Sequence, residues 1–444
     1  MSEIPSDTRK ITPCTRPVDT VVDLPGSKSI TNRALLLAAL ANGESILRGV
    51  LDSDDTRAMI GALTALGVPI DFDCAASIAR VAGHGGFFVP NARVDVASSG
   101  TTARFLTAAL ALSPGRYTID GSPQMRRRPL GDLIGALAML GAKTDSSGGY
   151  LPLTTGGFIT PSGKSLSCQV SGSISSQFLS ALLMAAPLAG DRVDIAVTEP
   201  IVSRPYIEMT AAMIRAFGCD PGTDNTLTRF VIPRGTAYQA RVYDIEPDAS
   251  AASYFFALAA ILGGKVTVPR LTRSALQGDV GFVDCLAAMG CAVIEETNAL
   301  TIRRDVNRPL KGIDIDMNAI SDTAQTLSVV ALFAEGPTRI RRIVHVRAKE
   351  TDRISAVVSQ LRRLGAVVEE FEDGLLITPC REKYRGAPIE TFDDHRMAMS
   401  FALAGLAIPG VEIENPGCVA KTFPDFFNRL GAALEANEKR RNTD

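Results

Sequence analysis

The feature that most constrains this chain is a unit that recurs along its whole length. A helix-like stretch ending in an apolar residue, a glycine and a small residue appears six times, as in LTALGV and LAMLGA. Glycine just past a helix can adopt the left-handed conformation that stops it. In the first five copies a strand-like run with alternating apolar residues soon follows. The six glycines are Gly67, Gly141, Gly218, Gly290, Gly365 and Gly431.

A second signal, an alanine-rich apolar helix, recurs in step with the first. These helices are apolar around most of their circumference, which predicts that they are buried. Each unit is therefore predicted to be a β-α-β-α-β-β module with one buried and one more exposed helix. Repeats of this kind set the architecture of a protein. The apolar helices open near Lys28, Gly100, Ser175, Asp248, Asp322 and Asp394, 72 to 75 residues apart.

Six modules in 444 residues predict two domains of three modules each. The first domain is expected to span residues 25–245, and the second to combine residues 1–24 with residues 246–444. The chain would cross between them near Leu24-Pro25 and again between Tyr243 and Pro247. The strand predicted in segment 16–24 is assigned to the second domain, where it would complete the third module.

Composition excludes several classes of protein. With 46 basic and 48 acidic residues, the chain has no global charge that would favour nucleic acid or a membrane surface. The polar start predicts no secretory signal, and no apolar run reaches the roughly eighteen residues that span a bilayer. Eight cysteines without a CxxC pair predict reduced thiols in a cytoplasmic protein. His84, His345 and His395 have no metal-ligand spacing, so neither a metal nor a cofactor is expected.

The chemistry is expected at the starts of the buried helices. The first turn of a helix carries unpaired N–H groups and the positive end of the helix dipole, so it binds phosphate and other anions. The alternative is that the Ser, Thr and Asp residues there are ordinary N-caps. N-capping explains less well the openings that carry Lys28, Arg33 or Arg396. A cation disfavours the positive helix end unless an anion lies between them.

Further basic residues stand in loops and at other helix starts. A guanidinium donates two hydrogen bonds at once to a carboxylate or phosphate. The clusters therefore indicate a site for a small molecule with several negative charges. The alternative is a solvated charged face, which is a sufficient account of Arg126 and Arg127. The clusters cover residues 126–128, 203–206, 349–353 and 421–424.

Seven motifs, taken as a set, resemble the 5-enolpyruvylshikimate-3-phosphate synthase family. They run in order over residues 15–435 and are LPGSKSITNRALLLAALA, SGTTARFL, GSISSQFLSALLMAAPLA, VSRPYI, KETDRI, DDHRMAMSFAL and AKTFPDFF. The resemblance implies a two-domain inside-out α/β barrel of six β-α-β-α-β-β repeats, three per domain, with the active site in the cleft between the domains. It also implies an enzyme of the shikimate pathway of aromatic amino acid biosynthesis. That enzyme transfers the enolpyruvyl group of phosphoenolpyruvate to the 5-hydroxyl of shikimate 3-phosphate, releases phosphate and is the target of glyphosate.

Carried over residue by residue, the resemblance implies three sets of site residues. Shikimate 3-phosphate would be held by Lys28, Ser29, Arg33, Ser175, Ser176, Gln177, Ser203, Tyr206, Asp322, His345 and Lys349. Phosphoenolpyruvate would be held by Lys28, Gly100, Arg128, Gln177, Arg353, Arg396 and Lys421. In catalysis, Asp322 would accept the proton of the attacking hydroxyl, and Glu350 would deliver a proton to the methylene carbon. Lys421 is the alternative carrier of that proton, and Lys28 would also reach the enolpyruvate donor.

The chain departs from the family's common pattern at three positions. Ser98, Phe105 and His345 stand where many members have Asn, Pro and Asn. Ser98 and Phe105 flank the turn at Gly100, so altered donor binding and reduced sensitivity to glyphosate are expected. Phe105 is expected to act by shifting that turn. His345 leaves one inferred contact with shikimate 3-phosphate open.

Two other functions fit the same fold. One is transfer of enolpyruvate to UDP-N-acetylglucosamine, but that sister family typically carries a cysteine in the loop that corresponds here to GSPQMRRRPL, which has none. The other is a catalytically inactive anion-sensing protein, which would need no paired acid and base such as Glu350 and Asp322. The expected partners are the two small-molecule substrates, and the expected state is a monomer.

Overall fold

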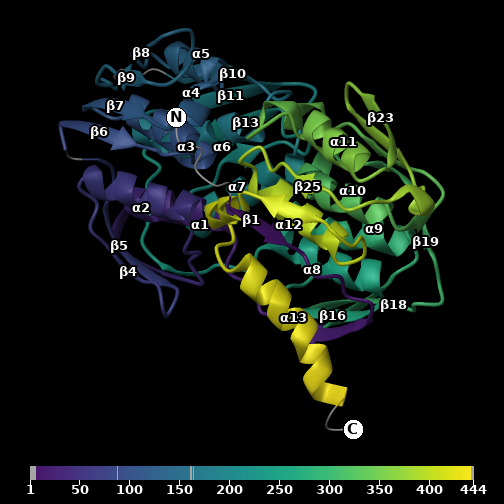
Figure 1. Ribbon diagram of the computed structural model, residues 1–444. Coiled ribbons are helices and arrows are strands. Elements are labelled where there is room, and N and C mark those ends of the chain that lie inside the picture. Colours follow the sequence, from purple (N-terminus) through teal and green to yellow (C-terminus); the bar gives the residue numbers. More distant parts are fainter. Residues whose placement is uncertain (1–6, 88, 161–162, 164, 442–444) are drawn as a thin grey trace. The chain divides into compact units, whose positions relative to one another are not determined.

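The computed structural model describes residues 7–87, 89–160, 163 and 165–441, with side chains up to residue 435. The chain divides into two compact units. Gly26–Glu246 forms the N-terminal unit, and Met1–Pro25 with Pro247–Asp444 forms the C-terminal unit. In Figure 1 the N-terminal unit runs from purple to teal, and the C-terminal unit continues to yellow. None of the described helices is long and apolar enough to cross a membrane.

The N-terminal unit contains three sheets of the same design, in which two parallel strands are followed by an antiparallel pair. One module runs β6 (Asn91–Asp95), α3 (Gly100–Ala111), β7 (Arg116–Asp120), α4 (Pro123–Arg126), α5 (Gly131–Met139), β8 (Thr144–Ser146) and β9 (Leu153–Thr155). The next runs β10 (Leu166–Ser171), α6 (Ser176–Ala185), η1 (Ala186–Ala189), β11 (Val193–Thr198), α7 (Arg204–Ala216), β12 (Gly222–Thr223) and β13 (Arg229–Ile232).

The remaining module of this unit joins its two ends. Its parallel strands are β14 and β15, which come last in the unit, and β3, which comes first. This sheet is therefore built from the first and the last strands of the N-terminal unit. The elements are α1 (Lys28–Leu40), β3 (Ala41–Arg48), α2 (Asp54–Ala65), β4 (Ile70–Asp73), β5 (Ile78–His84), β14 (Tyr238–Gln239) and β15 (Val242–Asp244).

The C-terminal unit repeats the design. Its first module contains β2 (Val18–Val21), α8 (Ala249–Leu262), β16 (Gly264–Pro269), η2 (Gly278–Gly281), α9 (Phe282–Ala288), β17 (Ala292–Glu296) and β18 (Ala299–Arg304). Its second contains β20 (Asp314–Asp316), η3 (Asn318–Thr323), α10 (Ala324–Ala331), β22 (Thr338–Arg341), η4 (Val344–Ala348), α11 (Arg353–Arg363), β23 (Val367–Phe371) and β24 (Gly374–Thr378). The short strands β19 (Leu310–Lys311) and β21 (Ala334–Glu335) pair beside it.

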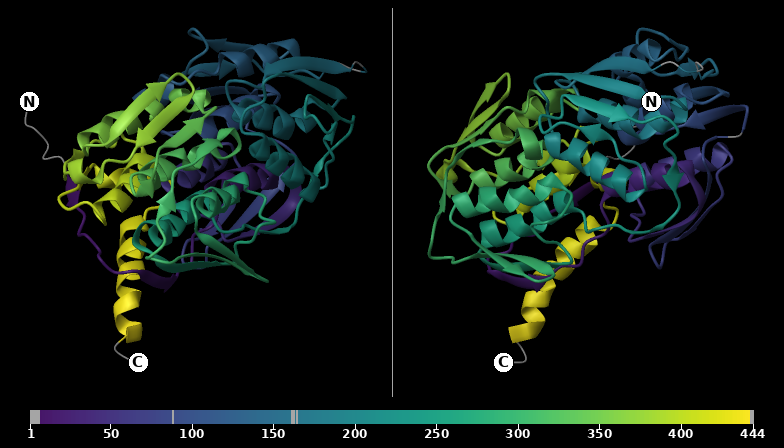
Figure 2. Two further views of the ribbon diagram at one scale, coloured as in Figure 1. Left: turned by 90° about the vertical axis from the view of Figure 1, so that its right-hand side faces the viewer. Right: turned by 180° about the vertical axis from the view of Figure 1, so that it is seen from behind.

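The third module of the C-terminal unit differs from the other modules. It contains β25 (Pro388–Ile389), α12 (His395–Gly405), β26 (Glu412–Glu414), η6 (Pro416–Lys421) and α13 (Phe426–Arg441), preceded by the turn η5 (Arg381–Lys383). No described strand follows α13. The N-terminal strand β1 (Thr8–Lys10) instead pairs antiparallel with β26, so the sheet has three strands. Figures 1 and 2 show α13 extending away from the rest of its unit.

Two expectations about the repeats need correction. The strand in segment 16–24, β2, pairs in parallel with β16 and so completes the first module of the C-terminal unit, not the third. The glycines of the first five copies have φ between +82° and +105°, as expected for helix ends, but Gly431 lies inside α13. Without a hairpin to form after it, the last copy has no need of a helix stop at that glycine.

The predicted buried helices form the core of each unit. In the N-terminal unit, α3 packs against both α1 and α6. In the C-terminal unit, α8, α10 and α12 contact one another. Each unit has its own hydrophobic core, and residues 249–261 of α8 are buried without interruption. Because polar first turns interrupt this apolar packing, the helix starts are where charged side chains can gather.

Candidate active site

Asp322 lies at the centre of a charge cluster in the C-terminal unit, in η3 and two residues before α10. Its Oδ1 accepts a hydrogen bond from Arg353 Nη1 at 3.0 Å and lies 3.7 Å from Lys349 Nζ. Its Oδ2 accepts from Arg396 Nη2 at 2.9 Å, and its backbone carbonyl accepts from Arg396 Nη1 at 3.0 Å. Three cations therefore surround the Asp322 carboxylate. Arg353 comes from the start of α11, Arg396 from the start of α12, and Lys349 from the residue after η4.

Glu350 shares Arg353 with Asp322. Arg353 Nη2 donates to Glu350 Oε2 at 2.8 Å, and Lys421 Nζ lies 3.7 Å from Glu350 Oε1. The side chains of Arg353 and Glu350 are only 3% and 7% exposed, so this pair is largely shielded from water. Burial lowers the pKa of Arg353, but the carboxylates of Asp394, Glu350 and Asp322 outweigh burial and raise it. Arg353 is thus a permanent cation that links both proposed proton-transfer groups.

Asp394, which the sequence marks only as the opening of a helix, completes the cluster. It is the N-cap of α12, and its Oδ1 accepts from the backbone N–H of Arg396 at 2.9 Å. Its Oδ2 accepts from Arg353 Nε at 2.7 Å. Asp394 therefore fixes the orientation of Arg353 while starting the helix that carries Arg396. In the sequence, this role is indicated by the position of Asp394 two residues before Arg396.

His345 lies beside this cluster, in η4. Its Nε2 is 2.8 Å from the Oγ of Ser321, the residue before Asp322. Burial, and then the positive charge of Lys349, lower the pKa of His345 to about 4. The imidazole is therefore neutral near pH 7.

A second buried acid that the sequence analysis missed is Asp279, in η2. Ser250 in the first turn of α8 donates a hydrogen bond to it. Burial, and then the negative charge of Asp322, raise the pKa of Asp279 to about 6. The glutamine before it, Gln277, accepts from the N–H of Ala249 at 3.0 Å, so the pair ties η2 to the start of α8.

Lys28 opens the equivalent set in the N-terminal unit. It is the first residue of α1, whose N-cap is Ser27. Its Nζ lies 3.4 Å from Oδ2 of Asp55, which is buried in the first turn of α2. Asp55 was not singled out from the sequence, because an acidic residue in a first helical turn is common and gives no signal of its own.

Arg33, one turn after Ser29 in α1, is buried with only 1% of its surface exposed. Its guanidinium donates to the Ser29 carbonyl at 2.9 Å, to Ser180 Oγ at 3.2 Å and to Thr210 Oγ1 at 2.7 Å. All three of these acceptors are neutral. Burial therefore lowers the pKa of Arg33 to about 10, with a small opposing effect of Tyr206. A buried cation held by neutral acceptors favours a bound anion.

The turn at Gly100 is closed by two arginines. A Cβ placed on Gly100 would lie 2.6 Å from Arg128 Nη1 and 2.8 Å from Arg104 Nη1. Arg104 donates to the carbonyl of Gly100 at 3.0 Å and is 3% exposed, while Arg128 is 7% exposed. Ser98, at the other side of this turn, lies 2.8 Å from Ser122 through their hydroxyls. The absence of a side chain at Gly100 thus lets Arg128 lie against the start of α3.

The serines predicted to bind shikimate 3-phosphate lie at the starts of α6 and α7. Ser175 caps α6, and its Oγ accepts from the N–H of Gln177 at 3.2 Å. N-capping therefore accounts for Ser175 in this structure. Ser203 precedes α7 with φ at 52°, and its side chain makes no capping hydrogen bond. Tyr206, in the first turn of α7, accepts from Thr210 Oγ1 at 2.7 Å through its carbonyl, which connects it to the Arg33 network.

The predicted site residues therefore fall into two groups, one in each unit. Lys28, Ser29, Arg33, Gly100, Arg128, Ser175, Ser176, Gln177, Ser203 and Tyr206 belong to the N-terminal unit. Asp322, His345, Lys349, Glu350, Arg353, Arg396 and Lys421 belong to the C-terminal unit. In neither group do three or more His, Cys, Asp or Glu side chains come together as metal ligands, as far as the described residues extend.

The fold and these groups define an enzyme class. Two units of three α/β modules, with basic residues at helix starts and a carboxylate pair on a shared arginine, are the features of an enolpyruvyl transferase. Residues 14–430 match the family model described as EPSP synthase (3-phosphoshikimate 1-carboxyvinyltransferase). The chain belongs to this family.

Relatives in sequence and in structure agree with the family model. The chain is 46% identical to a 3-phosphoshikimate 1-carboxyvinyltransferase of Trichormus variabilis over 96% of this chain and 98% of that protein. It is 48% identical to one of Cupriavidus taiwanensis over 94% and 97%. A solved structure of EPSP synthase from Acinetobacter baumannii is similar with a TM-score of 0.79 at 26% identity, over 96% and 98%. The predicted family, fold class and enzyme activity are thus confirmed.

Proposed function

We propose that the chain transfers the enolpyruvyl group of phosphoenolpyruvate to the 5-hydroxyl of shikimate 3-phosphate, with Asp322 as base and Glu350 as acid. The observation that carries these roles is the pair of carboxylates held by one arginine, Arg353. The reaction needs a base for the hydroxyl and an acid for the methylene carbon, close together but in different states. A shared cation keeps both groups in one small region.

Asp322 suits the role of base because its cationic partners have better ligands in the substrates. Arg353 and Arg396 are proposed to bind phosphoenolpyruvate, and a guanidinium pairs with a carboxylate or phosphate in a bidentate fashion. When the donor binds, its anionic groups compete with Asp322 for both arginines. The Asp322 carboxylate is then available to accept the proton of the 5-hydroxyl. At the same time the hydroxyl oxygen bonds to the central carbon of phosphoenolpyruvate.

Glu350 suits the role of acid because it is buried between Arg353 and Lys421. These cations favour its carboxylate form in the absence of substrate. Donor phosphate would partly neutralise them and make protonation of Glu350 easier. Lys421 stays an alternative carrier, since its ammonium lies 3.7 Å from the same carboxyl oxygen. In the second step the carbon–oxygen bond to phosphate breaks and phosphate leaves. The methyl group that protonation formed from the methylene carbon then returns a proton to the same acid.

The N-terminal unit is proposed to supply most of the contacts to shikimate 3-phosphate. Ser175, Ser176, Gln177 and Ser203 would bind its phosphate and hydroxyls, with Tyr206 lining the pocket. Lys28, Ser29 and Arg33 would contact the ring, and Lys349 and His345 would add contacts from the C-terminal unit. Gly100, Arg128 and Gln177 would complete the donor site. Because both units supply residues, substrate binding should draw them together, which small-angle scattering would detect as a smaller radius of gyration.

The decisive experiment is phosphate release from phosphoenolpyruvate with two acceptors and a control without acceptor, run in parallel. We expect release with shikimate 3-phosphate, and none with UDP-N-acetylglucosamine or with no acceptor. Activity should persist in a strong chelator. Release with UDP-N-acetylglucosamine alone would reject the proposed acceptor, and no release with either acceptor would favour an inactive anion-binding protein.

The cell compartment and assembly state are part of the same proposal. All eight cysteines are free, and Cys168, Cys219, Cys285 and Cys291 are buried. Free thiols fit a reducing compartment, so we propose a cytoplasmic enzyme. Because each unit contains its own core, a monomer is the proposed state, and sedimentation equilibrium would test it.

A further inference from the structure

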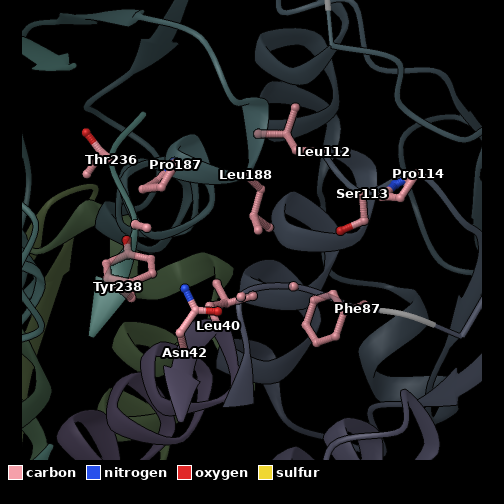
Figure 3. A pocket seen from close by; sticks show the side chains of 13 residues that line it. Leu40, Asn42, Phe87, Leu112, Ser113, Pro114, Pro187, Leu188, Thr236 and Tyr238 are labelled. Carbon is pink, nitrogen blue, oxygen red and sulfur yellow. The ribbon is translucent and has the colours of Figure 1, made fainter. Parts of the chain in front are cut away.

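A cavity of about 320 Å³ lies in the N-terminal unit, at the far end of the helices whose starts carry site residues. Figure 3 shows its lining side chains. Leu40 is the last residue of α1, which begins at Lys28, and Leu112 is the C-cap of α3, which begins at Gly100. Leu188 lies in η1, the continuation of α6. None of the proposed substrate contacts lines this cavity.

The hydroxyl groups of the cavity have their hydrogens committed to backbone carbonyls. Ser113 donates to the carbonyl of Ala109 at 2.7 Å. Tyr238 donates to the carbonyl of Met184 at 2.9 Å. Thr236 donates to the carbonyl of Pro233 at 2.6 Å. Each oxygen keeps lone pairs but has no hydrogen left to donate, so these three groups can only accept from a ligand.

The helix ends add to this preference for a donor. The last carbonyls of a helix lack intrahelical partners and form the negative end of its dipole, which favours a cation. None of the thirteen lining residues, all from the described part of the chain, carries a charge. Apolar surface is supplied by Leu40, Phe87, Leu112 and Leu188. A volume of this size is at the lower end of pockets that bind small molecules, roughly 300 Å³ and above.

We propose that this cavity binds a small organic ammonium, a protonated primary amine on a compact apolar or aromatic body. The ammonium supplies three hydrogen-bond donors to the three hydroxyl oxygens and the amide oxygen of Asn42, and its charge matches the helix ends. The apolar body packs among Phe87 and the leucines. Among the side chains of the thirteen lining residues, an anion could accept hydrogen bonds only from the amide of Asn42, and it would face the negative helix ends.

Titration calorimetry with three compounds of similar size tests this ligand class. The probes are 2-phenylethylamine, 2-phenylethanol and 3-phenylpropionate. We expect saturable binding of the amine, binding of the alcohol weaker by about tenfold, as for the loss of one charge-assisted hydrogen bond, and no binding of the carboxylate. Equal binding of all three probes, or no binding of the amine, would overturn the proposal.

A filled cavity tests the location. A Cβ on Gly86 would meet only Leu188 Cδ2, at 3.9 Å, so Gly86→Leu can place a side chain in the cavity without a clash. The matched control is Gly61→Leu on the exposed face of α2, where a Cβ meets nothing within 4 Å. We expect Gly86→Leu to abolish amine binding and Gly61→Leu to retain it, with phosphate release unchanged in both as evidence of folding. Amine binding that persists in an active Gly86→Leu variant would place the ligand elsewhere. If Gly86→Leu is inactive, Ser113→Ala is tested in the same way. Loss of amine binding in an active Ser113→Ala variant would support this location, and retained binding would overturn it.

Discussion

The guanidinium of Arg33 lies over the ring of Phe105, with its Cζ 5.0 Å from the ring centroid. Arg104, the residue before Phe105 in α3, donates to the carbonyl of Gly100 at 3.0 Å. Neighbouring residues of one helix therefore support two different parts of the proposed site. Arg104 supports the donor turn, and Phe105 supports a cation proposed to contact shikimate 3-phosphate.

This geometry changes the expectation for Phe105. The sequence suggested that its bulk, where many family members have Pro, would shift the Gly100 turn and so weaken glyphosate binding. In the structure Phe105 is the sixth residue of α3, where proline would remove a helix hydrogen bond and cost roughly 3 kcal/mol. Leucine is therefore the informative substitution, since it keeps the helix and removes the ring.

We predict that Phe105→Leu raises the KM for shikimate 3-phosphate by roughly 2- to 30-fold, the range for a cation–π contact of about 0.5–2 kcal/mol. The KM for phosphoenolpyruvate should change less than the KM for the acceptor. Phe178→Leu is the matched control, because Phe178 lies under Arg104 at 5.8 Å and should affect the donor instead. If both variants alter only the donor, Phe105 does not act through Arg33.

Gly100→Ala should weaken glyphosate more than phosphoenolpyruvate. The added methyl group would displace the guanidinium of Arg128, which a Cβ would approach to 2.6 Å. Loss of one hydrogen bond to a charged group costs about 1.5–3 kcal/mol, so we expect the inhibition constant to rise roughly 10- to 100-fold. Gly135→Ala, on the exposed face of α5, is the control. An unchanged inhibition constant would mean that the donor does not bind beside this turn.

Asp322→Asn and Glu350→Gln should each lower kcat by about a hundred- to ten-thousand-fold, the usual contribution of a general acid or base. Asp322→Asn should also raise the dissociation constant of shikimate 3-phosphate more than Glu350→Gln does, because of these two residues only Asp322 is assigned a contact with it. Asp316→Asn, which alters an exposed pair with Arg342, serves as the control in steady-state and calorimetric measurements. Near-normal turnover in either variant would reject that residue's role.

His345 should make folding stability depend on pH. Its pKa is about 4 in the folded protein and about 6.5 in a model peptide, so the unfolded chain binds more protons between these values. Its contribution is fully present above pH 6.5 and is lost as the pH falls toward 4, by roughly 3 kcal/mol in total. The raised pKa of Asp279 makes folding stability depend on pH in the opposite direction. The folded state favours its protonated form, so this contribution to stability is lost as the pH rises from about 4 to about 6.

His345→Asn separates these two effects. Because the substitution leaves Asp279 in place, the difference in free energy of unfolding between the parent and the variant should isolate the histidine. We expect the parent to lose stability relative to the variant between pH 7 and pH 4.5 in urea unfolding experiments. A difference that does not change with pH would show that His345 is not buried as a neutral ring.

The sequence by itself determined the repeat, the fold class and the chemistry of the helix starts. Apolar periodicity and glycine stops are local properties, and six copies in step leave few architectures that bury all the apolar helices. The tertiary structure decided which strand completes which sheet. β1 has three residues and β2 has four, too few to specify a partner strand by their pattern. Their pairing with β26 and β16 depends on where the tertiary fold places the first residues of the chain.

The same division holds for the site. Lys28, Glu350 and Arg396 could be named from the motifs that contain them, and Asp322 from its place at the opening of a buried helix. The roles of Asp394 and Phe105 could not, because each acts on an arginine that is distant in sequence, Arg353 and Arg33 respectively. Hydrogen bonds and ring contacts between such residues form only when the buried helices pack side by side. Sequence therefore predicts which residue types stand at the helix starts, and packing alone decides which of them are paired.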